Sequence, residues 1–192
     1  MSDVSPDFEA LASALRDSTF RPDFAVREIP SPTGVAPYSV AFAGDVRPDS
    51  HGDSLYGTGR FLLLHDPDEP ESWASAWRIG AFAQAPLELE MGTDPLLADV
   101  AWSWLTDALE TNGAAYHSAS GTATKTVSRG FGALSAQGDG SQIELRASWT
   151  PDPPSTRHIE AWAELVCMLA GLPPGSEEIA VLRPGLRLPR ST

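Results

Sequence analysis

Apolar residues recur at two different spacings along the chain, and the change of spacing separates predicted helices from predicted strands. Between residues 94 and 113 they return every three or four positions, which is the spacing of one helix face. Asp94 before Pro95 is typical of a helix start, and Asn112 before Gly113 is typical of a helix stop. We therefore predict a central helix whose apolar face is formed by Leu97, Val100, Ala101, Trp104, Leu105 and Ala108.

Two more helices are predicted near the ends of the chain. A short one begins at Ser5 and Pro6 and carries Phe8, Leu11, Ala12 and Leu15 on one face. The last helix starts near Ser155 or Thr156 and stops at Gly171. Its apolar residues cover so much of the helix surface that most of its circumference should be buried.

Short apolar runs between these helices predict strands at Phe24–Ile29, Tyr38–Phe42, Arg60–His65 and Trp77–Ala83, with a polar loop from Gly44 to Gly59. Residues 77–83 are apolar or small on both faces, as expected of a central strand that is covered on both sides. Arg78 is the exception. A guanidinium in such a strand needs a carboxylate partner or a route to solvent, and Glu88, Glu90 and Asp94 are the candidate partners.

Residues 118–128 alternate with a period of two, because every even position is Ser or Thr and the odd positions are mostly small. This pattern predicts a strand with one hydroxyl-lined face. Gly130 and Gly132 predict a bend or bulge around Phe131, and residues 137–140 predict a tight hairpin turn. The returning strand places Ile143, Leu145, Ala147 and Trp149 on one face.

The order of these elements predicts an α+β fold, with an antiparallel sheet of about five to seven strands and three helices on one face. A chain of 192 residues fits one domain. We assign residues 1–174 to that domain and residues 175–192 to a C-terminal tail that contains proline and arginine. The element order resembles the secretion-chaperone-like α+β fold in topology.

The charge and the cysteine content narrow the expected partners and location. The formal net charge is −13, which disfavours direct binding to nucleic acid or to an anionic membrane surface. We expect another protein as the partner, and a monomer or homodimer. The single cysteine, Cys167, lies in the last apolar helix. Because we also find no signal-peptide pattern and no apolar run as long as a membrane span, we expect a cytoplasmic protein.

Motifs for several common chemistries are missing from the sequence. The four histidines, His51, His65, His117 and His158, are scattered, and no cysteine pair could complete a zinc site. No Gly-x-Ser-x-Gly motif occurs. Residues 121–126 lack the glycine and the following helix of a phosphate-binding loop, and residues 57–59 lack the third glycine of a dinucleotide site. The sequence therefore predicts no cofactor and no metal.

The function that these features favour is a non-catalytic protein-binding or adapter module. Ser120, Thr122 and Thr124 on the hydroxyl-lined strand are candidate binding residues, by strand addition if that strand lies at a sheet edge. Trp102 is a further candidate, because it lies roughly 100° from the apolar face of the central helix and Trp is enriched at interface hot spots. The alternative for Trp102 is a core residue at the border of the helix.

Two alternative functions stay open. The first is a small-molecule enzyme with a pocket at the start of the central helix, where Glu88 or Glu90 acts as general base and Arg78 holds an anionic substrate. The second is an acidic regulator that occupies a nucleic-acid-binding or RNA-processing protein, which requires the carboxylates to cluster along one face.

Four stretches together resemble the actinobacterial domain-of-unknown-function family three thousand. They are residues 57–67, 91–109, 146–151 and 160–173, within a match that runs from about Pro37 to Pro174. The resemblance implies a cytoplasmic actinobacterial protein, and the gene neighbourhoods of that family point to RNA metabolism. It brings no activity, cofactor or catalytic residue to transfer.

Overall fold

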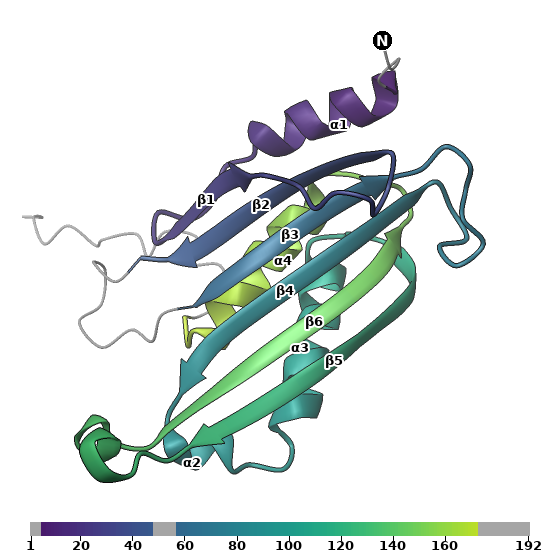
Figure 1. Cartoon of the computed structure of the whole chain (residues 1–192). Helices are drawn as coiled ribbons and strands as arrows, with labels where there is room; N and C mark the ends of the chain where they lie inside the picture. The colour runs from purple at the N-terminus through teal and green to yellow at the C-terminus, as the bar shows by residue number, and fades with distance from the viewer. Residues whose placement is uncertain (1–4, 48–56, 173–192) are drawn as a thin grey trace, which may run out of the picture.

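A computed structural model describes residues 5–47 and 57–172, which form one six-stranded antiparallel sheet with helices on one face (Figure 1). The strands are β1 (Phe24–Ile29), β2 (Tyr38–Val46), β3 (Thr58–His65), β4 (Trp77–Leu87), β5 (Tyr116–Ser128) and β6 (Gly140–Pro151). The helices are α1 (Pro6–Arg16), α2 (Leu89–Gly92), α3 (Leu97–Thr111) and α4 (Arg157–Leu169), with a 3-10 helix, η2 (Gly132–Gln137). The predicted tail, residues 175–192, lies outside the described residues.

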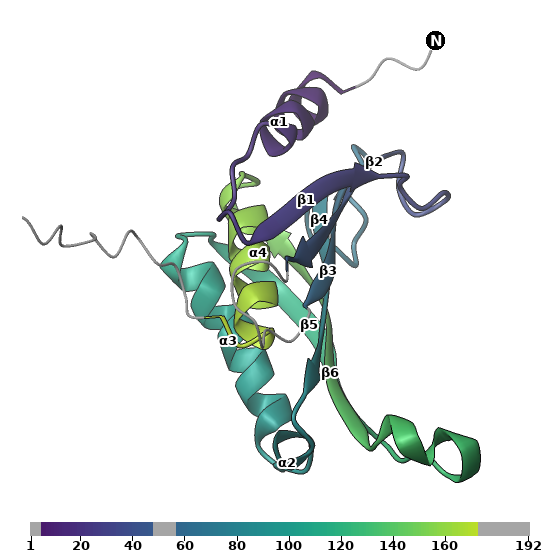
Figure 2. The same ribbon diagram turned by 90° about the vertical axis from the view of Figure 1, so that its left-hand side faces the viewer.

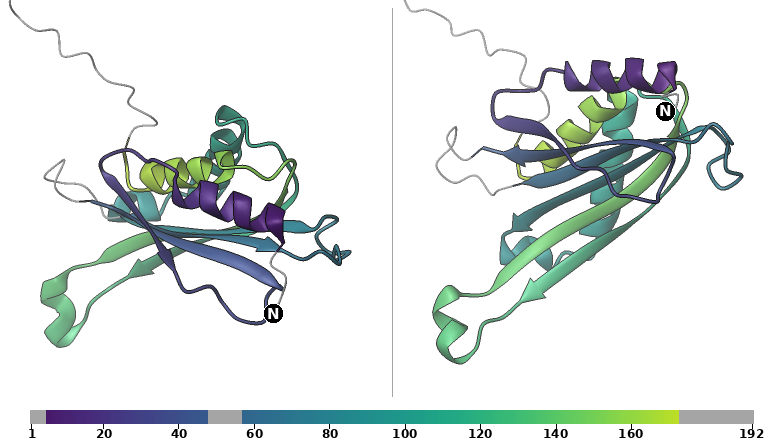
Figure 3. Two further views of the ribbon diagram at one scale, coloured as in Figure 1. Left: turned by 90° about the horizontal axis from the view of Figure 1, so that it is seen from above. Right: turned by 45° about the horizontal axis from the view of Figure 1, so that its top comes forward.

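The strand order is β1-β2-β3-β4-β6-β5, and every neighbouring pair is antiparallel. Figure 2 and the left panel of Figure 3 show α1, α3 and α4 on the same side of the sheet, while no α-helix among the described residues lies on the other side. The predicted α+β class, with its antiparallel sheet and one helical layer, is therefore confirmed.

The registers identify the side chains on each face. A Cβ atom at Gly44 or Gly59 would come within 3.0 Å of the Trp162 ring, so these positions lie under α4. The indole N–H of Trp162 donates to the carbonyl oxygen of Phe82 at 3.0 Å, and the ring is fully buried. Aromatic and aliphatic side chains from α4 and the helical face of the sheet thus form the core.

β4 lies in the middle of the sheet, but the prediction that it is covered on both sides is wrong. Ile79, Ala81, Ala83, Ala85 and Leu87 point to the helices and are buried, whereas the intervening residues are half-buried or exposed. The small or apolar character of Gly80 and Phe82 suggested a second covering layer. In the structure both residues belong to the open face of the sheet, which carries no α-helix of the described chain.

Several element boundaries also differ from the sequence prediction. β2 continues to Val46, because glycine at position 44 allows Phe24 and Trp162 to pack where a side chain would stand. α3 begins at Leu97, after a turn in which the Asp94 carboxylate accepts the Leu96 N–H at 2.8 Å. The expected stop is present, since Gly113 has φ +64°.

The connection between β5 and β6 is longer than the tight turn predicted at residues 137–140. It contains η2, and Gly132 and Gly138 both have positive φ. Phe131 and Leu134 are 75% and 55% exposed in this connection, which projects beyond the body of the protein (Figure 2). A run of small and polar residues after Gly130 hid this short helix from periodicity arguments.

Candidate functional site

β5 forms one edge of the sheet. Eleven of its thirteen residues are paired with β6, and no backbone–backbone hydrogen bond joins it to any other part of the chain that the structure describes. In a regular antiparallel strand, every second residue directs its N–H and C=O away from the neighbouring strand. The outer side of β5 therefore presents a row of backbone donors and acceptors without a backbone partner among residues 5–47 and 57–172.

The hydroxyl-lined face predicted for this strand is on the open side of the sheet. Ser120, Thr122, Thr124 and Thr126 are all exposed there. Ser120 and Thr122 border a shallow hollow of about 400 Å³, together with Arg146 and Ser148 of β6. The two strands thus form a polar surface that reaches the sheet edge.

A β-bulge interrupts β5 between His117 and Ser120, and it brings the strand into contact with Arg78. Ser118 has φ +52°, and its carbonyl oxygen accepts a hydrogen bond from Arg78 Nη1 at 2.9 Å. Arg78 also donates to the hydroxyls of Thr150 at 3.0 Å and Ser148 at 2.8 Å. The guanidinium therefore joins β4, β6 and the bulge in β5 across the open face.

Arg78 forms no ion pair with the carboxylates expected as its partners, Glu88, Glu90 and Asp94. The five ion pairs among the described residues leave Arg78 out, and burial lowers its pKa from the ordinary value. Arg78 stands at the start of β4, whereas Glu88 and Glu90 follow its end, about 30 Å away at the rise of an extended strand. The structure therefore does not bring Arg78 and the two glutamates together in one pocket.

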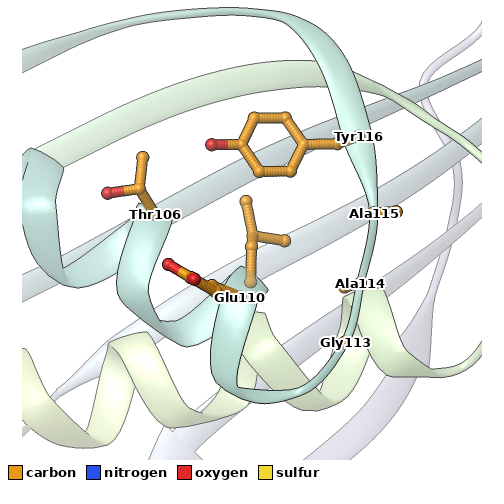
Figure 4. Close-up of a pocket in the computed structure, with 7 residues that line it drawn as sticks. Thr106, Glu110, Gly113, Ala114, Ala115 and Tyr116 are labelled. Carbon is orange, nitrogen blue, oxygen red and sulfur yellow. The ribbon is translucent and has the colours of Figure 1, made fainter.

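On the helical side, a pocket of about 510 Å³ lies between the end of α3 and the start of β5 (Figure 4). Its lining residues come from the last turns of α3 and the start of β5 and are Thr106, Leu109, Glu110, Gly113, Ala114, Ala115 and Tyr116. In Figure 4 the tyrosine ring lies across the pocket from the Thr106 and Glu110 side chains.

Trp102 lies between α3 and β5. A Cβ atom at Gly121 would come within 2.7 Å of the Trp102 ring, so the indole packs directly on the glycine of β5. Trp102 is half-buried and packs against the core. This position agrees with the alternative interpretation, a core residue at the helix border.

α2 and Asp94, in the turn before α3, lie beside the end of β5. Lys125 donates a hydrogen bond to the Asp94 carbonyl oxygen, and Val127 lies near Gly92 of α2. Val127 is 53% exposed. From Tyr116 to Lys125 the edge spans about 30 Å at the rise of an extended strand.

Charge is distributed unevenly over the two sides of the sheet. The strands carry four arginines on the open face, with only two carboxylates beside them: Arg27, Arg60, Arg78 and Arg146, with Asp45 and Glu144. Arg60, Phe82 and Arg146 stand in one row across three strands, and Arg146 lies 5.5 Å from the Phe82 ring centroid. In contrast, the charged side chains of α3 are all acidic.

The sequence indicated the strand and its hydroxyl face but missed the pocket beside it. Tyr116 precedes the regular alternation, and Thr106 and Glu110 belong to the polar side of α3. The pocket forms only because the Asn112–Gly113 stop returns the chain beside the helix, with the Ala114 N–H bonded to the Leu109 carbonyl at 2.8 Å. The only sequence feature that pointed to this pocket was a polar helix face followed by a tyrosine.

Comparison with known proteins finds a matching family but no activity. A family model described as protein of unknown function (DUF3000) matches residues 4–180. No curated protein and no solved structure matches the chain. Among the helices that the structure describes, none is long and apolar enough to cross a membrane.

Proposed function

The chain belongs to the DUF3000 family of unknown function, and we propose that it is a non-catalytic protein-binding module of the cytoplasm that receives an extended segment of a partner along the outer edge of β5. In this mode the partner adds a seventh strand to the sheet. Main-chain hydrogen bonds supply affinity, and pockets for alternate side chains supply specificity.

The observation that carries the proposal is the length of the free edge. β5 has thirteen residues, whereas strands in globular proteins commonly have about five or six. Natural edge strands are usually short or protected by charge, proline or a covering element. Between Tyr116 and Ser128 there is no proline, and Lys125 is the only lysine. The single bulge lies near one end.

The pocket on the helical side supports the same proposal. A strand placed beside β5 would direct alternate side chains toward α3, where the Tyr116 pocket and the Trp102 border lie. Its other side chains would extend the hydroxyl-lined face next to Ser120, Thr122 and Thr124. Both candidate surfaces from the sequence thus serve one extended ligand, one on each side of the added strand.

The small-molecule enzyme is the weaker candidate, because its pocket required Arg78 close to Glu88 or Glu90. Those groups stand at opposite ends of β4. Arg78 is instead held by three neutral oxygen atoms of the protein. The role of Arg78 in the proposed module is therefore structural, since it joins β4, β5 and β6.

A pair of proline variants tests strand addition. Of two neighbouring residues in β5, one directs its N–H to β6 and the other directs it outward. Thr122→Pro and Ala123→Pro therefore remove one inward and one outward donor. The inward variant should lose stability, and the outward variant should keep its melting temperature.

The tagged wild-type protein and the folded proline variant are then compared in affinity purification from native cells with mass spectrometry. Partners that the wild-type protein retains and the folded variant loses would support strand addition. Equal recovery of every partner by both proteins would contradict it. An exposed substitution on α1, Glu9→Gln, controls for unrelated surface changes.

A further inference from the structure

We infer that the partner segment is basic, and that one of its lysine or arginine side chains occupies the pocket between α3 and Tyr116. This inference rests on the proposed strand addition at β5 and specifies the chemistry of the ligand. Nothing in the family description assigns a ligand to this pocket.

The composition of the pocket matches a lysine or arginine side chain. Leu109, Ala114 and the Tyr116 ring supply apolar surface, and Thr106 and Glu110 supply oxygen atoms. In Figure 4 the Tyr116 hydroxyl points toward the side of the pocket that Thr106 and Glu110 form, and the Thr106 hydroxyl donates to the Ser103 carbonyl oxygen at 2.9 Å. Lysine and arginine combine an apolar stem with a cationic end, so they match both kinds of surface.

Glu110 has no cationic partner among the described residues. None of the ion pairs or side-chain hydrogen bonds of the structure includes its carboxylate. Arg157 lies nearby but donates to the Gly113 carbonyl oxygen at 3.4 Å. Glu110 is exposed at the rim of the pocket, where an incoming ammonium or guanidinium can approach it.

The other charged residues of α3 and β5 favour the same kind of ligand. Asp99, Thr106 and Glu110 are spaced by seven and four residues, so they follow one side of α3, the side that also carries Trp102. Two carboxylates therefore face a strand at the β5 edge. The one Lys or Arg of β5, Lys125, stands at the far end beside Asp94. A bound segment should place its basic residue at the Tyr116 end and a neutral or acidic residue near Lys125.

Other occupants fit these observations less well. The tail of the same chain carries arginines, but Pro184 and Pro189 interrupt its sequence and cannot donate to a strand ladder. A second copy paired through β5 would bring two α3 helices side by side, each with Asp99 and Glu110. Like charges at such an interface oppose association. A separate, basic protein segment is the occupant that charge complementarity favours.

Selection from a displayed library of random twelve-residue peptides, with the full chain immobilised, tests the inference. Synthetic copies of the selected peptides are titrated into isotope-labelled protein, and the perturbed amides are assigned by NMR. The expected binders carry a basic residue that reaches the Tyr116 pocket, and they perturb the amides of β5 and Tyr116. Glu110→Gln should weaken them about two- to fivefold, as expected for one partly exposed ion pair, and Glu9→Gln should not.

The possible outcomes distinguish failure of the basic-ligand inference from failure of the proposed strand addition. Peptides that perturb β5 but lack basic residues, or that bind Glu110→Gln as tightly as the wild type, would overturn the basic-ligand inference and leave strand addition intact. Failure of every selected peptide to perturb β5 would overturn both. A β5-dependent dimer in sedimentation experiments would instead identify a second copy as the occupant and also overturn the inference.

Discussion

Trp149 donates its indole N–H to Nδ1 of His158 at 3.1 Å, and both side chains are fully buried. Because Nδ1 accepts this bond, the imidazole proton lies on Nε2, which is 3.2 Å from the Pro153 carbonyl oxygen. The contact joins the end of β6 to the first turn of α4. It fixes a neutral histidine in the core.

This arrangement predicts a loss of stability in mild acid. Burial lowers the pKa of His158 below its ordinary value, while the bond to Pro153 acts in the opposite direction. The unfolded chain takes up a proton near pH 6.5 and the folded protein resists it. The free energy of unfolding should therefore be greatest above about pH 6.5 and should decrease from there toward pH 5, measured by urea denaturation.

His158→Gln provides the control, because it retains the other three histidines. It should be less stable than the wild type at pH 7.5, and its stability should depend less on pH between 7 and 5. Restricting the range to pH above 5 limits the contribution of carboxylates such as Asp45, whose pKa is lowered by Arg27 and Thr58 against the effect of burial. Equal pH slopes for both proteins would refute the assignment.

Gly121 is predicted to tolerate no side chain. A Cβ atom there would lie 2.5 Å from the Arg146 carbonyl oxygen and 2.7 Å from the Trp102 ring. Gly121→Ala should lower the free energy of unfolding by about 1–3 kcal/mol through overpacking. Gly140→Ala is the matched control, since nothing lies within 4 Å of its added Cβ atom. Similar melting temperatures for the two variants would contradict this packing.

Arg78 should contribute to stability in proportion to its hydrogen bonds. Arg78→Ala removes three of them, and we expect a loss of about 1–3 kcal/mol in chemical denaturation. Arg60 projects from the same face, is exposed, and has no ion pair or side-chain hydrogen bond among the described residues. Arg60→Ala should therefore change stability by less than about 0.5 kcal/mol. Equal losses would show that the Arg78 bonds add nothing.

Cys167 should be inert in the folded protein. It is fully buried in α4, and burial raises the pKa of its thiol to about 12. At pH 8 the thiolate that reacts with aromatic disulfide reagents is therefore scarce and inaccessible. We expect no reaction in buffer and one equivalent after unfolding in urea. Rapid labelling of the native protein would show that α4 opens or packs differently.

Periodicity was sufficient to predict the elements whose environment is uniform. β5 alternates hydroxyl and small residues because one face meets solvent and the other meets α3. α4 is apolar around most of its surface because the sheet and α3 bury nine of its residues. Such patterns follow directly from burial, so the α+β class and the single helical layer were predictable.

The candidate site depends on contacts between segments that are far apart in the sequence, and no local sequence pattern reveals them. Arg78 was expected to seek a carboxylate, but the register of β4 against β6 places Ser148 and Thr150 beside it, and the bulge adds the Ser118 carbonyl oxygen. The Tyr116 pocket likewise requires α3 and β5 to diverge after Gly113. Both features arise from strand order and register, which a single sequence leaves open.

Amide hydrogen exchange along β5, followed residue by residue with NMR, decides whether the outer edge of this strand is free to receive a partner. In the free protein, alternate amides from Ser120 to Ser128 should exchange rapidly because they point outward, while the intervening amides bonded to β6 should be protected. Addition of a selected peptide should then protect the rapidly exchanging set. Protection of all β5 amides in the free monomer, or no added protection with bound peptide, would contradict a free edge that receives a partner strand.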